Sequence, residues 1–87
     1  MTAPRLVQVF RSASREGMYL IVDRARGLAD VPEALLGSFG RAEPSLVFRL
    51  HADRRLAQAE APVVLEAIER QGFYLQLPPV EPEDDDA

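Results

Sequence analysis

The sequence predicts an α/β fold, a single compact α/β/α sandwich in which helices pack on a four-stranded sheet built in the order ββαβαβ. Two strand-like runs open the chain, a run with helical spacing ends at Gly72, and 87 residues can bury one modest core. We therefore expect one domain over residues 1–80. Residues 81–87 contain five of the fourteen acids and are predicted to form a disordered acidic tail.

The first two strands are predicted to form a hairpin. Residues 6–10 are rich in β-branched and aromatic side chains, and residues 18–22 are apolar without interruption. The connection over residues 11–17 is polar and ends in Gly17, which can take a positive φ. The unbroken apolar run indicates that both faces of the second strand are covered.

A short helix is predicted after Asp30. Asp30 is expected to act as its N-cap, Pro32 fits a first turn, and Glu33 stands at the capping-box position. Gly40 is expected to end the helix in the left-handed conformation. The apolar side of this helix is predicted to consist of Leu35, Leu36 and Phe39.

A third strand is predicted over residues 46–50, where Arg49 faces away from the core and Pro44 marks the beginning or an edge position. The expected core side chains of this strand are Leu46, Phe48 and Leu50. The main helix follows from Pro62, with Val64, Ala67 and Ile68 at helical spacing, and Gly72 ends it. Residues 73–77 alternate as a fourth strand, which Pro78-Pro79 stops.

Composition excludes several kinds of chemistry. The chain has no cysteine, so disulfides, thiolate nucleophiles and cysteine-ligated metal sites are excluded. It shows neither a leader pattern nor an apolar segment near the roughly 20 residues that cross a bilayer, and we expect a cytoplasmic protein. Without the acidic tail the chain is close to neutral, because residues 1–80 hold ten Arg and nine acids.

The connection over residues 11–17 is the best candidate binding loop. Two guanidinium groups, two hydroxyls and backbone amides in one turn suit a phosphate or carboxylate. The candidate site residues are Arg11, Ser12, Ser14 and Arg15, and an extended basic patch would add Arg5, Arg24 and Arg26. The alternative is that a hairpin simply needs a polar turn, in which Glu16 pairs with a nearby arginine.

His51 is the single histidine and is the remaining catalytic candidate. A general base needs a positioned substrate and an orienting partner, and no second histidine or cysteine is present to complete a metal site. A solvent-facing turn histidine beside Asp53 is the favoured interpretation. We expect no enzyme activity, no cofactor and no metal site.

Four blocks of the sequence carry a resemblance to a known family. They are Phe10-Arg11-Ser12 with Tyr19-Leu20, Val31-Pro32-Glu33 with Leu35, Phe39-Gly40, and Gln71-Gly72-Phe73-Tyr74-Leu75-Gln76-Leu77-Pro78-Pro79. In this order they resemble the YcgL family of small bacterial proteins. The resemblance implies a compact α/β/α sandwich in the cytoplasm, without an established activity. Two positions depart from the family pattern, which tends to have Lys where this chain has Ser14 and Asp where it has Glu60.

Three functions follow as hypotheses. The leading one is a small cytoplasmic, non-catalytic binding or adaptor module that contacts a protein partner through the loop at residues 11–17. The alternative is an RNA-associated accessory domain in which arginines contact phosphates, namely Arg5, Arg11, Arg15, Arg24 and Arg26. The resemblance also implies genes placed near ribonuclease D, which is a contextual hint toward RNA metabolism. The third is a minor hydrolase that uses His51. The oligomeric state and the identity of the partner are open.

Overall fold

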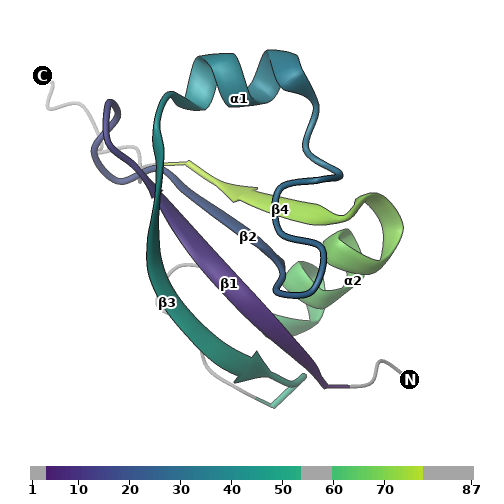
Figure 1. Ribbon diagram of the computed structural model, residues 1–87. Helices are drawn as coiled ribbons and strands as arrows, with labels where there is room; N and C mark the ends of the chain where they lie inside the picture. The colour runs from purple at the N-terminus through teal and green to yellow at the C-terminus, as the bar shows by residue number, and fades with distance from the viewer. Residues whose placement is uncertain (1–3, 54–59, 78–87) are drawn as a thin grey trace, which may run out of the picture.

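The computed structural model describes residues 4–53 and 60–77, which form a four-stranded antiparallel sheet and two helices (Figure 1). The elements are β1 (Arg5–Ser12), β2 (Tyr19–Asp23), α1 (Glu33–Phe39), β3 (Ala42–Leu50), α2 (Ala61–Gln71) and β4 (Phe73–Gln76). The predicted order ββαβαβ is confirmed. The strands lie in the order β3-β1-β2-β4, so β3 and β4 are the edges of the sheet. The predicted tail at 81–87 and Pro78-Pro79 lie outside the described residues.

The hairpin of β1 and β2 forms as predicted. Val9 lies opposite Ile21 in the antiparallel register, and Gly17 has a φ of 86° in the connection. Three consecutive residues of β2 are buried, namely Leu20, Ile21 and Val22. Because successive side chains of a strand point to opposite faces, this burial confirms that both faces of β2 are covered.

The helices cover opposite faces of the sheet. On one face, α2 packs in a core cluster made of Val7, Val9, Ile21, Leu50, Ala61, Val64, Leu65 and Ile68. On the other face, α1 and the segment before it pack in a second cluster made of Met18, Leu20, Val22, Val31 and Phe39. The two clusters meet at β2, so the molecule has the three layers that the sequence predicts.

The main helix follows its predicted pattern, and its expected core residues Val64, Ala67 and Ile68 are buried. Glu60 is the N-cap residue and makes no side-chain cap hydrogen bond. At the other end, Gly72 takes the left-handed conformation and its N–H donates to the carbonyl of Ile68 at 2.8 Å. A Cβ on Gly72 would collide with the side chain of Asp30, so α2 ends in close contact with the segment before α1.

The predicted cap of the first helix is wrong. The N-cap residue of α1 is Pro32, and no side chain caps the helix. The carboxylate of Asp30 instead accepts hydrogen bonds from Nε and Nη2 of Arg26, because a bidentate guanidinium is a stronger partner than a single amide. Gly40 ends α1 with a positive φ of 84°, but its ψ of −159° is outside the left-handed region. The predicted apolar side is confirmed, with Phe39 buried and Leu35 and Leu36 partly buried.

The third strand is longer than predicted and lies at an edge. It begins at Ala42, and Pro44 stands inside it next to an irregularity of the register, where the lost amide is tolerated. Leu50 is buried and Phe48 partly buried, as expected. The placement of Leu46 in the core is wrong, since 52% of this residue is exposed. Leu46 lies on the same face of the sheet as Phe48 and Leu50, as predicted, but neither helix covers the strand at this point.

Two glycine substitutions should have opposite effects on stability. Gly72→Ala places a Cβ at positive φ against Asp30 and should lower the free energy of unfolding by about 1–3 kcal/mol. Gly37→Ala lies inside α1 with nothing within 4 Å of the new methyl group, and should raise it by about 0.5–1 kcal/mol. Urea unfolding followed by circular dichroism measures both. Equal destabilisation by the two variants would contradict this assignment.

Candidate functional site

The loop that was predicted to bind a ligand is organised around a buried hydroxyl. Ser12 is 4% exposed, and its Oγ donates to the carbonyl of Phe39 at the end of α1. The same Oγ accepts hydrogen bonds from the backbone amides of Ser14 and Arg15, at 3.2 and 2.9 Å. These contacts fix the loop against α1, and they use donors that an anion would need.

The two arginines of this loop also have internal partners. Nη2 of Arg11 lies 2.9 Å from Oε1 of Glu43 on the neighbouring strand β3, so the pairing with Glu16 that the sequence suggested is not the one formed. Nε of Arg15 donates to the carbonyl of Ser38 at 2.9 Å. The hydroxyl of Ser14 lies close to Gly40, where a Cβ would overlap it. The four predicted residues are thus near one another, and two of them, Ser12 and Arg15, hold the loop to α1, while Arg11 pairs with β3.

The hollow beside the loop has a volume of about 590 Å³ and does not favour an anion. Two carboxylates line it, those of Glu16 and Glu43, together with the single guanidinium of Arg11. Because phosphate binding depends on an excess of positive charge, the local charge disfavours a phosphate here. Binding by this loop stays a prediction.

The predicted extension of the basic patch is divided by ion pairs. Nη1 of Arg5 lies 2.7 Å from Oδ2 of Asp23, which joins the start of β1 to the end of β2. Arg26 is paired with Asp30. Arg5 and Arg11 stand six residues apart on β1, which places their Cα atoms about 20 Å from each other. The predicted arginines therefore form no single patch.

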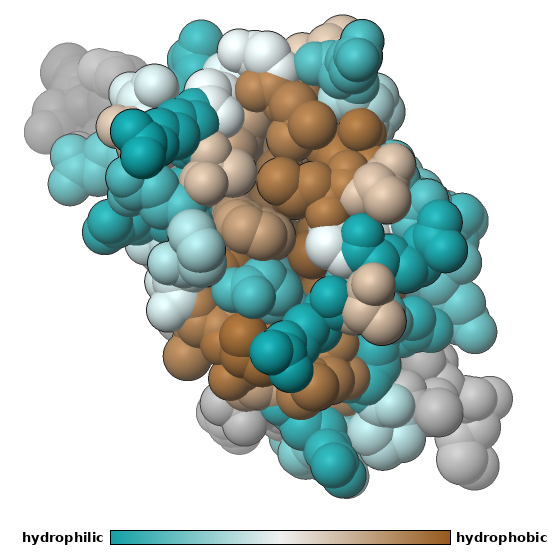
Figure 2. Space-filling view, viewed as in Figure 1, coloured by the Kyte–Doolittle hydropathy of each residue, from teal (hydrophilic) through white to brown (hydrophobic). Residues whose placement is uncertain are grey.

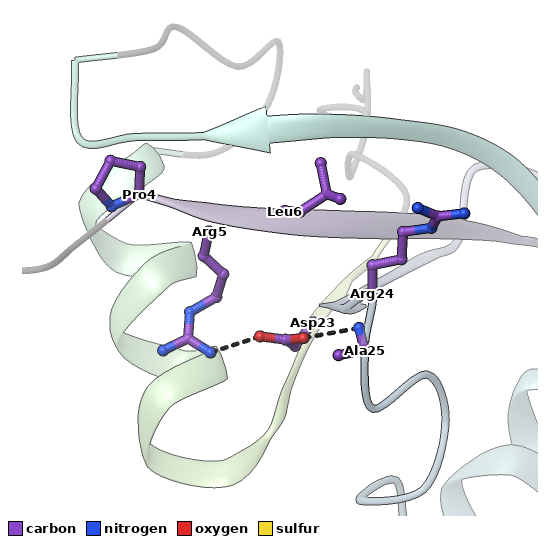
Figure 3. Close-up of a pocket in the computed structure, with 6 residues that line it drawn as sticks. All are labelled: Pro4, Arg5, Leu6, Asp23, Arg24 and Ala25. Carbon is purple, nitrogen blue, oxygen red and sulfur yellow. Dashed lines mark hydrogen bonds and ion pairs between the residues drawn. The ribbon is translucent and has the colours of Figure 1, made fainter.

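Arg24 differs from its neighbours because its guanidinium is exposed and unpaired within residues 4–53 and 60–77. It lines a hollow of about 600 Å³ together with Leu6 and the ion pair of Arg5 and Asp23. Figure 3 shows Arg24 and Leu6 on one side of β1, whereas Arg5 and Asp23 meet on the other. Arg24 thus stands beside an exposed apolar side chain.

Exposed apolar side chains gather where β1 and β3 lie next to each other. Leu6, Leu46 and Val47 are 44%, 52% and 41% exposed. Leu6 lies opposite Arg49 in the register and Val47 lies opposite Gln8, so these four residues share the face that carries α1. Figure 2 shows hydrophobic residues gathered on this face below α1. We call the set Leu6, Leu46, Val47, Arg24 and Arg49 the β3 surface, although Leu46 lies opposite Val9 and therefore on the α2 side of this edge.

Arg49 completes the charge of the β3 surface. Its side chain is exposed, and among the described residues it has neither a hydrogen bond nor an ion pair. The single carboxylate on β1 and β3 belongs to Glu43, which shares the opposite face with its partner Arg11. The β3 surface is therefore apolar and positive, without an acid on its α1 side in these two strands. The sequence did not predict the β3 surface, because neither segment by itself shows that β3 pairs with β1.

His51 follows β3 directly and is exposed, as is Asp53. Within the described ranges, no group of three or more His, Cys, Asp or Glu side chains could hold a metal ion. Neither described helix is long and apolar enough to cross a membrane.

Comparison with known proteins identifies the family. The profile of the YcgL domain matches residues 7–79. The chain belongs to the YcgL domain family. It is 60% identical over 75 residues to a YcgL domain-containing protein of Chromohalobacter salexigens, covering 86% of this chain and 78% of the relative. It is 50% identical over 74 residues to one of Saccharophagus degradans, covering 85% and 81%. The YcgL name states a domain and assigns no activity.

Substitution of Ser12 should test whether the loop is structural. Ser12→Ala leaves the carbonyl of Phe39 and two amides without their partner, and should lower the free energy of unfolding by about 1–3 kcal/mol. Ser14→Ala, in an exposed residue, removes a hydroxyl that has no hydrogen bond among the described residues and is the matched control, with a change below about 0.5 kcal/mol. Chemical unfolding compares them. An unchanged Ser12→Ala protein would show that the hydroxyl is free for a ligand.

The ion pair of Asp30 predicts a dependence on pH. Hydrogen bonding to Arg26 holds the pKa of the Asp30 carboxyl below its ordinary value, so its stabilisation is complete above that value and is lost as the pH falls through the folded pKa. Asp30→Asn keeps the shape next to Gly72 and removes the charge. The stability difference between wild type and this variant should therefore shrink from pH 7 to about pH 2.5, as urea unfolding would measure. A constant difference would contradict the assignment.

Proposed function

We propose that this chain is a small, non-catalytic cytoplasmic binding module that works through a protein partner. The observation that supports this most is the exposure of Leu6 and Val47 beside two arginines without a partner in the described residues, with Leu46 exposed on the other face of the same edge. Exposed apolar patches with a polar rim mark interaction sites, and arginine is enriched at them. Leu46 and Val47 are costly to leave in water, which supports their being covered by a partner.

The charge distribution favours a protein over RNA. Of the five arginines assigned to phosphate contact, Arg5, Arg11 and Arg26 are neutralised by carboxylates. Nucleic-acid affinity depends on counterion release by unpaired positive charge, and that charge is reduced here. Contacts to phosphates would also leave the exposed apolar side chains of the β3 surface unused. Hydrolysis through His51 gains no support, because no orienting partner stands beside this residue among the described ones.

An affinity capture from lysate, with and without ribonuclease, tests the proposed function. The baits are wild type, Leu46→Ser, Val47→Ser, the loop double variant Arg11→Ala/Arg15→Ala, and Val63→Ser as a control for an exposed valine on α2. We expect a protein, identified by mass spectrometry, that survives ribonuclease and is retained by wild type and Val63→Ser. Leu46→Ser and Val47→Ser should lower its recovery at least about fivefold, the size of a 1 kcal/mol loss.

Other outcomes have defined meanings. Loss of the partner with the loop double variant alone would assign binding to residues 11–17. Loss of the partner on ribonuclease treatment would favour the RNA-associated function. If no specific protein is retained by folded wild type, the proposed function is wrong. Thermal unfolding of each bait confirms that the variants are folded.

A further inference from the structure

We propose that β3 receives an extended, acidic segment of the partner protein, which pairs with the backbone of residues 46–50 and alternates acidic with apolar side chains. This proposal rests on the proposed protein-binding function and specifies its partner. The segment would add a fifth strand to the sheet, a mode of recognition in which main-chain hydrogen bonds give affinity and alternate side chains give specificity.

The exposure of two consecutive residues indicates a strand as the ligand. Leu46 lies opposite Val9, whose side chain belongs to the cluster under α2, whereas Val47 lies opposite Gln8 on the other face. A ligand that docks on one face covers one of these side chains. A strand that lies beside β3, about 4.8 Å away, covers both at once. No described strand pairs with that side of β3.

The length of the segment follows from Pro44. Proline has no N–H to donate, and the register of β3 against β1 shifts next to it. The regular part of the edge therefore extends from Leu46 to Leu50, where the backbone can form a ladder. Five residues of edge match a partner segment of about five to seven residues, or roughly 20 Å of extended chain.

The charges give the sequence pattern of the segment. On the α1 side of the sheet, an added strand would contact Val47 and Arg49. Arg24 lies farther from this edge, on the other side of Leu6, and no carboxylate of β1 or β3 lies on the α1 side. On the α2 side it meets Leu46 and the partly buried Phe48. Acidic residues toward the arginines and apolar residues toward Leu46 satisfy both sides. Because side chains alternate along a strand, acidic and apolar residues must alternate too.

A defined probe tests this pattern with the purified full chain. The probe is a fluorescein-labelled, end-capped heptapeptide of alternating Glu and Val, measured by fluorescence anisotropy at two salt concentrations. The controls are a heptapeptide of alternating Lys and Val and one with four Glu followed by three Val. We expect the alternating acidic peptide to bind at least about fivefold more tightly than either control, and more weakly at high salt. Amide NMR spectra should change at residues 46–50 and not at 73–76.

Matched variants locate the contact. Arg49→Glu replaces attraction by repulsion and should weaken binding about 3- to 10-fold, while Arg70→Glu, an exposed arginine of α2, should change it less than twofold. Two further peptides are N-methylated, one at every Val and the other at every Glu, so that each lacks the N–H donors of alternate residues. One of the two peptides should lose binding and the other should keep it, since alternate amides of a strand point toward β3.

Several results would overturn the proposal. They are equal binding of the three peptides, no binding at about 1 mM peptide, or loss of binding with both N-methylated forms. Self-association of the chain that Leu46→Ser abolishes, measured by analytical ultracentrifugation, would assign the edge to a second copy instead. If the lysate yields a partner that depends on Leu46 and the acidic peptide fails, this inference is wrong and the binding function stands. If the lysate yields none, the function itself fails.

Discussion

The structure depends on one constraint, which is that two short helices must cover both faces of a four-stranded sheet. At 1.5 Å per residue, α2 is about 16 Å long and α1 about 10 Å, whereas the nine residues of β3 extend about 30 Å. The helices converge on β2, where Leu20, Ile21 and Val22 are buried on both faces, and this leaves little helix to cover the far edge. The exposure of Leu46 and Val47 is a consequence of that geometry.

Ion pairs join β1 to its two neighbouring strands at the two ends of β1. Arg5 joins the start of β1 to β2 through Asp23, and Arg11 joins its end to β3 through Glu43. Both pairs lie on the α2 side of β1, at the two ends of a row that has Val7 and Val9 between them. The Arg5 pair is partly buried, so solvent screens it less than the more exposed Arg11 pair. Arginines that already pair with carboxylates of neighbouring strands are poor candidates for binding a ligand.

Features with a local cause were predictable from the sequence. The continuous run of β2, the spacing of α2 and the glycine that ends it each follow from neighbouring residues, and the structure confirms them. Errors arose where the outcome depends on distant segments. Leu46 alternates correctly with Phe48 and Leu50, yet its exposure depends on how far α2 reaches. Asp30 has the chemistry of a cap, but Arg26 one turn away competes for it. The partner of Arg11 required knowing that β3 lies beside β1.

The two edges of the sheet are protected unequally, and this difference bears on function. An open edge is a template for unwanted pairing, and proteins shield edges with short strands, prolines, bulges or charges. The edge at β4 is four residues long, and the first half of β3 contains Pro44 and an irregular register. The second half of β3 has five regular residues, two of them exposed and apolar, with Arg49 as the single charge. A positive charge repels basic strands and attracts acidic ones, so the unpaired second half of β3 selects among partner strands by their charge.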